Sequence, residues 1–142
     1  MSEAERIVAF LGGPKSVGRH TRTPIEFVEA IRSGLSARAI RHASAHLAVS
    51  TTALSEYLGL KRRTLSRRTS RLTPFESSRL YRLARLFARA SEVLAGPDAA
   101  RSWLRRPQRA LGGAVPVSLL DNEAGAVAVE RLLGRIEDGV VT

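Results

Sequence analysis

Apolar residues recur at three- to four-residue spacing in several segments of this chain, and each such segment predicts a helix with one buried face. Thr23, Pro24 and Glu26 form a capping box, which predicts the start of one helix. Gly34 is predicted to end this helix, and Ser36 to cap the next one, which runs to about residue 47. The buried positions predicted for the two helices are Phe27, Val28, Ile31, Ile40, Ala43 and Leu47.

Residues 50–70 combine two short amphipathic segments with a tight break between them. The first helix is predicted to begin after Ser50 or Thr51 and to end at Gly59, because glycine adopts the left-handed conformation of a sharp turn without strain. The second segment, KRRTLSRRTS, has Leu65 as its only large apolar side chain. This spacing is that of a helix-turn-helix, whose second helix enters the major groove of DNA. The core contacts predicted for the first helix and the turn are Leu54, Tyr57, Leu58 and Leu60.

A second capping box, at residues 73–76, opens a long helix that is predicted to end at Gly96. The apolar stripe of this helix consists of Leu80, Leu83, Phe87 and Leu94. Another side of the helix carries four arginines, Arg79, Arg82, Arg85 and Arg89. Two interpretations of this arginine face stay open, namely a solvated helix surface and a set of phosphate contacts beside the recognition helix.

The two ends of the chain contain more helix breakers. Residues 1–22 are predicted to form a short helix followed by a basic loop, because GGPKSVGRHTR contains three glycines and a proline. Near the other end, Trp103 and Leu104 end one helix, and Asp121 is predicted to cap a last helix that runs through Asp138. Gly125 lies inside this last helix at a cost of about 1 kcal/mol relative to Ala, which predicts close packing against a neighbour. The inward residues predicted for the last helix are Val129, Leu133 and Ile136.

The composition agrees with a folded, all-α protein. The 142 residues are 44% hydrophobic and 25% charged, so global disorder is not expected despite a net charge of +10. The chain has no cysteine, which excludes disulfides and thiolate metal sites. No apolar run approaches the roughly 18 residues of a membrane span, and we therefore expect a cytoplasmic protein with no membrane partner.

The positive charge is concentrated in one part of the sequence. Residues 61–109 contain fourteen basic and three acidic residues, a distribution typical of a phosphate-binding footprint. Within it, we predict that Arg62, Arg63 and Arg67 read base edges together with Ser66, because arginine binds guanine bidentately and the first turns of a recognition helix face the bases. Arg68 and Arg71 are predicted to bind phosphate. The complete predicted DNA-binding set is Lys61, Arg62, Arg63, Ser66, Arg67, Arg68 and Arg71.

Catalytic and metal chemistry have little support in the sequence. His42 and His46 lie one helical turn apart, as a pair of metal ligands would, but no third ligand is evident. The chain has three histidines and no arrangement of nucleophile and base. We expect no cofactor, no metal ion and no enzymatic activity.

The segments WLRRPQRALGGAVP, from Trp103 to Pro116, and LLDNEAGAVAVERLLGRIEDG, from Leu119 to Gly139, resemble the toxin-binding domain of the Xre/MbcA/ParS antitoxins. Upstream, GLKRRTLSRR and LTPFESSRLYRLAR are similar to the Xre-type DNA-binding half of these proteins. Two positions depart from the family pattern: Lys61 replaces the usual Ser or Thr cap, and Asn122 replaces a common Thr. The resemblance covers about residues 11–140.

The resemblance implies a type II antitoxin. Its partner would be a RES-domain toxin, an enzyme that destroys NAD, and the antitoxin would bind over the active site of that enzyme. The complex would also bind operator DNA and repress its own operon. The expected organisation is an N-terminal helix and basic loop (1–22), a helix-turn-helix domain (23–96) and a toxin-binding domain (97–142). We expect a homodimer, since a single helix-turn-helix reads few bases, and a hetero-oligomer with the toxin.

Two candidate toxin-binding surfaces remain open. The last residues, Gly139, Val140, Val141 and Thr142, supply small apolar and anionic groups that could enter a nucleotide pocket. The alternative is the helix surface around Arg131, Arg135 and Glu137. A rival function is a helix-turn-helix transcriptional regulator whose C-terminal module serves dimerisation or binds an effector, with no toxin partner. A neighbouring gene for a RES-type enzyme would distinguish the two functions.

Overall fold

The structure is a computed structural model that describes residues 1–18, 21–61 and 71–139. The described residues form helices and no strand, which confirms the all-α prediction. The α-helices are α1 (Glu3–Phe10), α2 (Pro14–Val17), α3 (Pro24–Ser33), α4 (Arg38–Leu47), α5 (Thr51–Leu58), α7 (Pro74–Val93), α8 (Pro97–Leu104) and α9 (Glu123–Glu137). Two 3₁₀ helices, η1 (Arg109–Leu111) and η2 (Pro116–Leu119), lie between α8 and α9.

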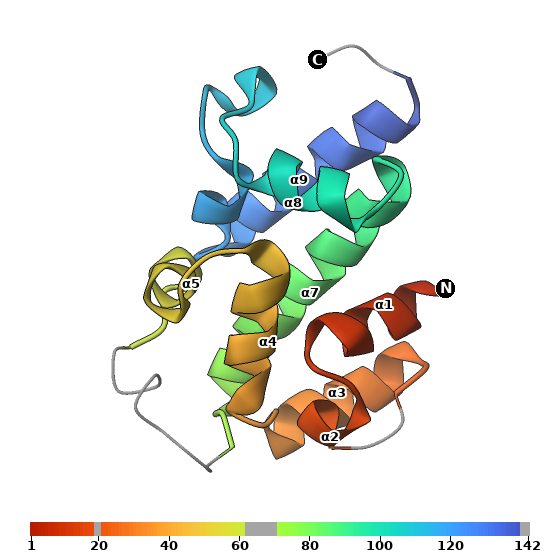
Figure 1. Cartoon of the computed structure of the whole chain (residues 1–142), viewed down its shortest axis with the longest axis vertical. Helices are drawn as coiled ribbons and strands as arrows, with labels where there is room; N and C mark the ends of the chain where they lie inside the picture. The colour runs from red at the N-terminus through yellow and green to blue at the C-terminus, as the bar shows by residue number, and fades with distance from the viewer. Residues whose placement is uncertain (19–20, 62–70, 140–142) are drawn as a thin grey trace.

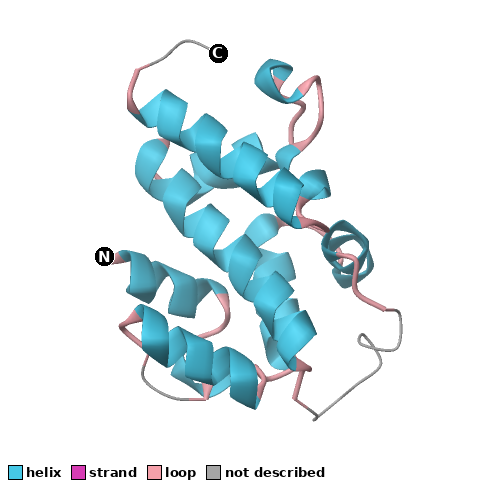
Figure 2. Cartoon of the chain, turned by 180° about the vertical axis from the view of Figure 1, so that it is seen from behind, coloured by secondary structure: helices cyan, strands magenta, loops and turns pink. Residues whose placement is uncertain are grey.

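Helix α7 is the central element of the fold (Figure 1). It packs against α1, α3 and α4 from the first half of the chain, and against α8 and α9 from the second half. The view from behind shows α7 passing between these two groups of helices (Figure 2). The buried apolar residues form a single core that extends from Ile7 to Leu133, so the two halves of the chain share one interior.

The predicted helix starts at Thr23 and Thr73 are confirmed. In each case the threonine hydroxyl accepts a hydrogen bond from the backbone N–H of the glutamate three residues later, and that glutamate accepts one from the N-cap backbone. Ser50 caps α5 in the same way, through the N–H of Ala53. A side-chain cap of this kind contributes about 1 kcal/mol to helix stability.

The turn after α5 also follows the prediction. Gly59 has a φ of 67°, in the left-handed region, and the N–H of Leu60 donates to the carbonyl of Ser55 at 2.8 Å. Leu54 and Leu58 are fully buried, and Tyr57 and Leu60 pack against the core from half-buried positions. The first helix and the turn of the helix-turn-helix are therefore present as expected.

Two helix starts differ from the prediction by a residue or two. Helix α4 begins at Arg38 with Ala37 as its N-cap, although the Ser36 hydroxyl still accepts from the N–H of Arg38 at 3.2 Å. Asn122, not Asp121, caps α9, because its side-chain oxygen accepts from the N–H of Gly125 at 2.9 Å. Asparagine is a good N-cap, so Asn122 fulfils the capping role that was predicted for the neighbouring Asp121.

The N-terminal segment is more ordered than the loop that we expected. Pro14 begins the one-turn helix α2, which is possible because proline at the first helical position has no N–H to satisfy. Ser16 and Val17 of this helix are buried. Gly12 lies so close to α4 that a Cβ atom there would be 2.3 Å from the His42 ring. Residues 12–18 are therefore part of the packed body.

The buried faces of the helices are largely as predicted. In α3, Phe27 and Ala30 are buried while Val28 and Ile31 are only half-buried, so the inward face is turned slightly from the predicted one. In α9, Val129 and Leu133 are fully buried and Ile136 packs against the core. Among the residues that the structure describes, no helix is both long enough and apolar enough to cross a bilayer.

Candidate functional site

The described part of the helix-turn-helix consists of α5, the Gly59 turn and the exposed residue Lys61. Five predicted DNA contacts, Arg62, Arg63, Ser66, Arg67 and Arg68, lie outside the described residues. Their roles stay predictions. The Gly59 turn lies against the long helix, since Arg79 of α7 donates a hydrogen bond to the carbonyl of Leu58 at 3.1 Å.

Arg71 lies directly after the recognition segment and holds the chain against the α3–α4 turn. Its guanidinium donates to the carbonyl of Gly34 at 3.1 Å. The neighbouring Leu72 N–H donates to the carbonyl of Leu35 at 2.8 Å, and the Leu35 N–H donates to the Ser77 hydroxyl at 2.9 Å. Arg71 thus has a structural role that the sequence did not reveal, and its predicted phosphate contact stays a prediction.

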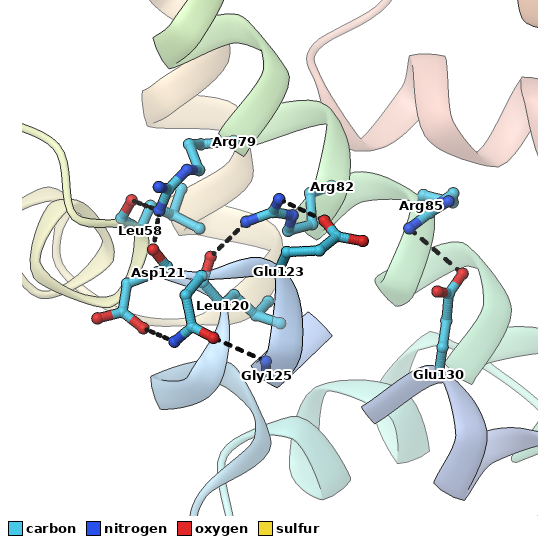
Figure 3. Close-up of polar contacts among 10 residues, drawn as sticks. Leu58, Arg79, Arg82, Arg85, Leu120, Asp121, Glu123, Gly125 and Glu130 are labelled. Atoms are coloured by element: carbon cyan, nitrogen blue, oxygen red, sulfur yellow. Dashed lines mark hydrogen bonds and ion pairs between the residues drawn. The ribbon is translucent and has the colours of Figure 1, made fainter. Parts of the chain in front are cut away.

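The sequence left two interpretations of the arginine face of α7 open, and the structure adds contacts within the molecule that neither of them included. Arg79, Arg82, Arg85 and Arg89, here called the arginine seam, all contact the segment that leads into α9 or α9 itself. Figure 3 shows the contacts of the first three. Arg79 donates to the backbone carbonyl of Asp121 as well as to Leu58, so one side chain ties α5, α7 and the start of α9 together.

The remaining members of the seam bind glutamates of α9. Arg82 donates to Leu120 O at 3.2 Å and pairs with Glu123 at 2.9 Å (Figure 3). Arg85 lies 3.3 Å from Glu130. Arg89 binds both carboxylate oxygens of Glu137, at 2.9 and 2.6 Å. The four arginines therefore bind groups within the molecule, a role that neither interpretation included. Phosphate contact by this face stays a prediction.

The spacing of the seam glutamates is a signal that is present in the sequence. Glu123, Glu130 and Glu137 recur every seven residues, which is close to two helical turns, so they lie on one face of α9. The hydrogen bonds from Arg89 lower the pKa of Glu137 below its ordinary value, and Glu137 in turn raises the pKa of Arg89. Each partner of this pair favours the charged form of the other.

The candidate toxin-binding residues of α9 differ in their exposure and in their contacts. Arg131 and Arg135 are exposed, one helical turn apart. Glu137 is held by Arg89, with its side chain 41% exposed. Gly139 follows the helix with a φ of 78°. Val140, Val141 and Thr142 lie outside the described residues.

The two histidines of α4 differ in their surroundings, since His42 is exposed and His46 packs against aromatic rings. His46 stacks on Phe10, with ring centroids 5.5 Å apart, and lies edge-on to Phe87 at 6.4 Å. Burial lowers the pKa of His46, so the neutral form is favoured in the folded state. Among the described residues, no three His, Asp or Glu side chains are arranged to hold a metal ion.

The fold and the seam define a class of protein in which a helix-turn-helix half and a C-terminal helical half share one long helix. Residues 26–85 match the family described as the antitoxin Xre-like helix-turn-helix domain. Residues 89–139 match the antitoxin Xre/MbcA/ParS C-terminal toxin-binding domain. The end of the first match and the start of the second both lie within α7.

Individual relatives agree with these matches. The chain is 33% identical over 117 residues to Antitoxin Xre of Yersinia enterocolitica, an alignment that covers 80% of this chain and 79% of that protein. It is 42% identical over 88 residues to Antitoxin Xre of Photorhabdus laumondii, where 59% of this chain and 60% of that protein are covered. A protein of a Sphingobium species named Prs ADP-ribosylating antitoxin is 29% identical over 129 residues, with 82% and 81% covered. The chain belongs to the Xre family of type II antitoxins.

Proposed function

We propose that this antitoxin neutralises a RES-domain toxin that degrades NAD, by binding over the active site of that enzyme, and that it binds operator DNA as a homodimer to repress its own operon. The match of residues 89–139 to a toxin-binding domain is the observation that carries the proposal. The helix-turn-helix match supports the DNA-binding half. The same toxin-binding match argues against a transcriptional regulator that has no toxin partner.

A second toxin chemistry is favoured by one relative, whose name describes the antitoxin of an ADP-ribosylating toxin. ADP-ribosylation also consumes NAD, so both candidate toxins have an NAD site that an antitoxin can cover. The two reactions differ in the fate of the ADP-ribose. It is released as a free product when NAD is degraded, and it is attached to a protein in ADP-ribosylation. The antitoxin would act in the same way on either enzyme.

The experiment that tests the function is co-expression with the enzyme encoded by the adjacent gene. We expect a stable complex, loss of NAD consumption on addition of the antitoxin, and binding of the complex to the promoter DNA of the operon. Mass spectrometry for ADP-ribosylated proteins distinguishes the two toxins. Absence of any complex between the two purified proteins would overturn the proposal.

The segment after α9 is proposed to cover the active site, with Arg131 and Arg135 holding the helix on the toxin. Deletion of residues 139–142 leaves the described core intact, because Leu132 and Leu133 are the last buried residues in the part of the chain that the structure describes. We therefore expect the truncated antitoxin to fold and to bind the toxin while NAD consumption returns. The assay compares activity at equal occupancy, and full inhibition by the truncated protein would place the inhibitory contact on α9 itself.

A further inference from the structure

Part of the acidic charge of the C-terminal half is paired with α7. Residues 110–142 contain five acidic and two basic residues. Three of the acids, Glu123, Glu130 and Glu137, pair with the arginine seam of α7. These three carboxylates are paired with α7 but stay partly exposed, with Glu123 at 77%. The other two acids, Asp121 and Asp138, are exposed, as are the two basic residues of α9, Arg131 and Arg135.

A second group of arginines lies on the loop that connects α8 to η2. Residues 105–114, here called the arginine loop, carry the exposed side chains of Arg105, Arg106 and Arg109. Within the described ranges of the chain, no carboxylate forms an ion pair with these three side chains. Their charge is available to a partner.

The arginine loop has a defined conformation. The Gln108 side-chain amide donates to the carbonyls of Trp103 and Arg106, at 3.0 and 3.2 Å. The backbone closes the loop, because the Gln108 N–H donates to Ala114 O and the Gly113 N–H donates to Gln108 O, both at 3.0 Å. A loop that is already ordered loses less conformational entropy on binding than a flexible one.

The position of the loop separates it from the DNA-binding half. The loop stands out from the body at the end of the molecule where α9 ends, while the end of α5 and the start of α7, which flank the recognition segment, lie toward the opposite end (Figures 1 and 2). Helix η1 of the loop packs against α9. The loop also lies inside the range 89–139 that matches the toxin-binding domain.

From these observations we infer that the arginine loop is a docking surface for an acidic patch on the toxin. Arginine is enriched at the energetic centres of protein interfaces, and charge complementarity accelerates association more than it changes final affinity. This inference rests on the proposed toxin binding and extends the interface from α9 to the loop. It also gives Arg105, Arg106 and Arg109 a role outside the phosphate footprint to which their sequence position had assigned them.

The test inverts the charge of the loop with the triple substitution Arg105→Glu, Arg106→Glu and Arg109→Glu. The matched control inverts three exposed arginines on α3 and α4, with Arg32→Glu, Arg38→Glu and Arg41→Glu. Association with a catalytically inactive form of the toxin from the adjacent gene is measured at low and at physiological salt. We expect the loop variant to associate at least about tenfold more slowly at low salt, with a smaller difference at higher salt, and the control to change by less than about twofold.

The other outcomes are distinguishable. Equal slowing of the loop variant and the control would show an effect of net charge alone and would overturn the inference. Unchanged toxin association with weakened DNA binding would assign the loop to phosphate instead. Failure of the wild-type antitoxin to bind the toxin would remove the proposed function itself. A neutral variant with glutamine at the three positions, together with an unchanged thermal unfolding midpoint, separates loss of charge from loss of fold.

Discussion

Gly125 and Gly134 lie in the same helix, α9, in different surroundings. A Cβ atom at Gly125 would be 1.8 Å from the backbone oxygen of Leu119, whereas a Cβ at Gly134 would meet no atom within 4 Å. The sequence predicted the close packing at Gly125 from its helix propensity alone, and the structure confirms it. It could not identify the neighbour, because η2 reaches this position only through the tertiary fold.

This difference predicts opposite effects for the same substitution. Gly125→Ala is expected to lower the free energy of unfolding by about 1 to 3 kcal/mol, since backbone atoms of η2 would have to move. Gly134→Ala is expected to raise it by about 0.5 to 1 kcal/mol through helix propensity. Urea unfolding of the two variants measures both changes, and a shift of the two midpoints in the same direction would contradict the packing argument.

The helix caps show how far the sequence reaches at the scale of single residues. Thr23 and Thr73 were predicted correctly because each is followed by a glutamate three positions later, which is a local signal. For α5 the sequence left Ser50 and Thr51 open, and the structure shows Ser50 as the cap. The pair Asp121 and Asn122 was not resolved, since both residue types are good N-caps. A contact from a distant helix distinguishes them: Arg79 binds the carbonyl of Asp121, and Asn122 caps α9.

At the scale of elements, the arginine seam is the feature that the sequence showed only in part. The arginine face of α7 was visible, but its partners in α9 and in the segment before α9 lie 38 to 48 residues further along the chain. Helical periodicity identifies which residues share a face, and it does not identify which faces meet. The seam could therefore be identified only from the structure. The seven-residue spacing of the glutamates does indicate an acidic face on α9 that is complementary to the arginine face of α7.

The seam predicts that the charges of Arg89 and Glu137 can be exchanged. Arg89→Glu places two carboxylates together and is expected to lower stability, while the double variant Arg89→Glu, Glu137→Arg restores the attraction and recovers most of the loss. A double-mutant cycle on the free energy of unfolding measures the coupling, which is expected to decrease as salt screens this partly exposed pair. Additive effects of the two substitutions would show that the pair does not contribute.

The pH dependence of this pair provides an independent check of the same contact. The hydrogen bonds from Arg89 hold the pKa of Glu137 below its ordinary value of 4.5. A carboxyl with a lowered folded pKa stabilises the protein at pH above the unfolded value, and this stabilisation is lost as the pH falls through the folded pKa. Glu137→Gln is therefore expected to reduce the slope of stability against pH in the acid range.

For the molecule as a whole, the distribution of charge along the sequence does not show on which faces of the fold the charges lie. The basic block of residues 61–109 was interpreted as one phosphate footprint, because sequence position alone does not separate faces. The structure distributes it: four arginines of α7 form the seam, three lie on the arginine loop, and the described ends of the recognition segment are Lys61 and Arg71. The proposed DNA footprint is therefore confined to the helix-turn-helix end of the molecule.

The sequence predicts a boundary at residue 96 between the helix-turn-helix domain and the toxin-binding domain, and α7 bears on this division. Leu86 and Ala88 are two positions apart, which places them on nearly opposite sides of a helix with 3.6 residues per turn, yet their exposed fractions are 0% and 1%. Helix α7 therefore has buried contacts on both sides. One group of its partners, α8 and α9, is absent from a chain that ends at Gly96.

We therefore predict that the fragment ending at Gly96 unfolds at lower denaturant concentration than the full antitoxin and with a less cooperative transition, because apolar side chains of α7 and the arginine seam lose their partners together. Its affinity for operator DNA is expected to fall in parallel, since the seam residue Arg79 no longer links α5 to the start of α9.

The antitoxin lacking only residues 139–142 is the matched control, because it keeps α8 and α9. Urea unfolding followed by circular dichroism and DNA binding by fluorescence anisotropy measure the two effects. A fragment with the stability and operator affinity of the full chain would show that the DNA-binding half folds independently, and that the shared core contributes to toxin binding alone.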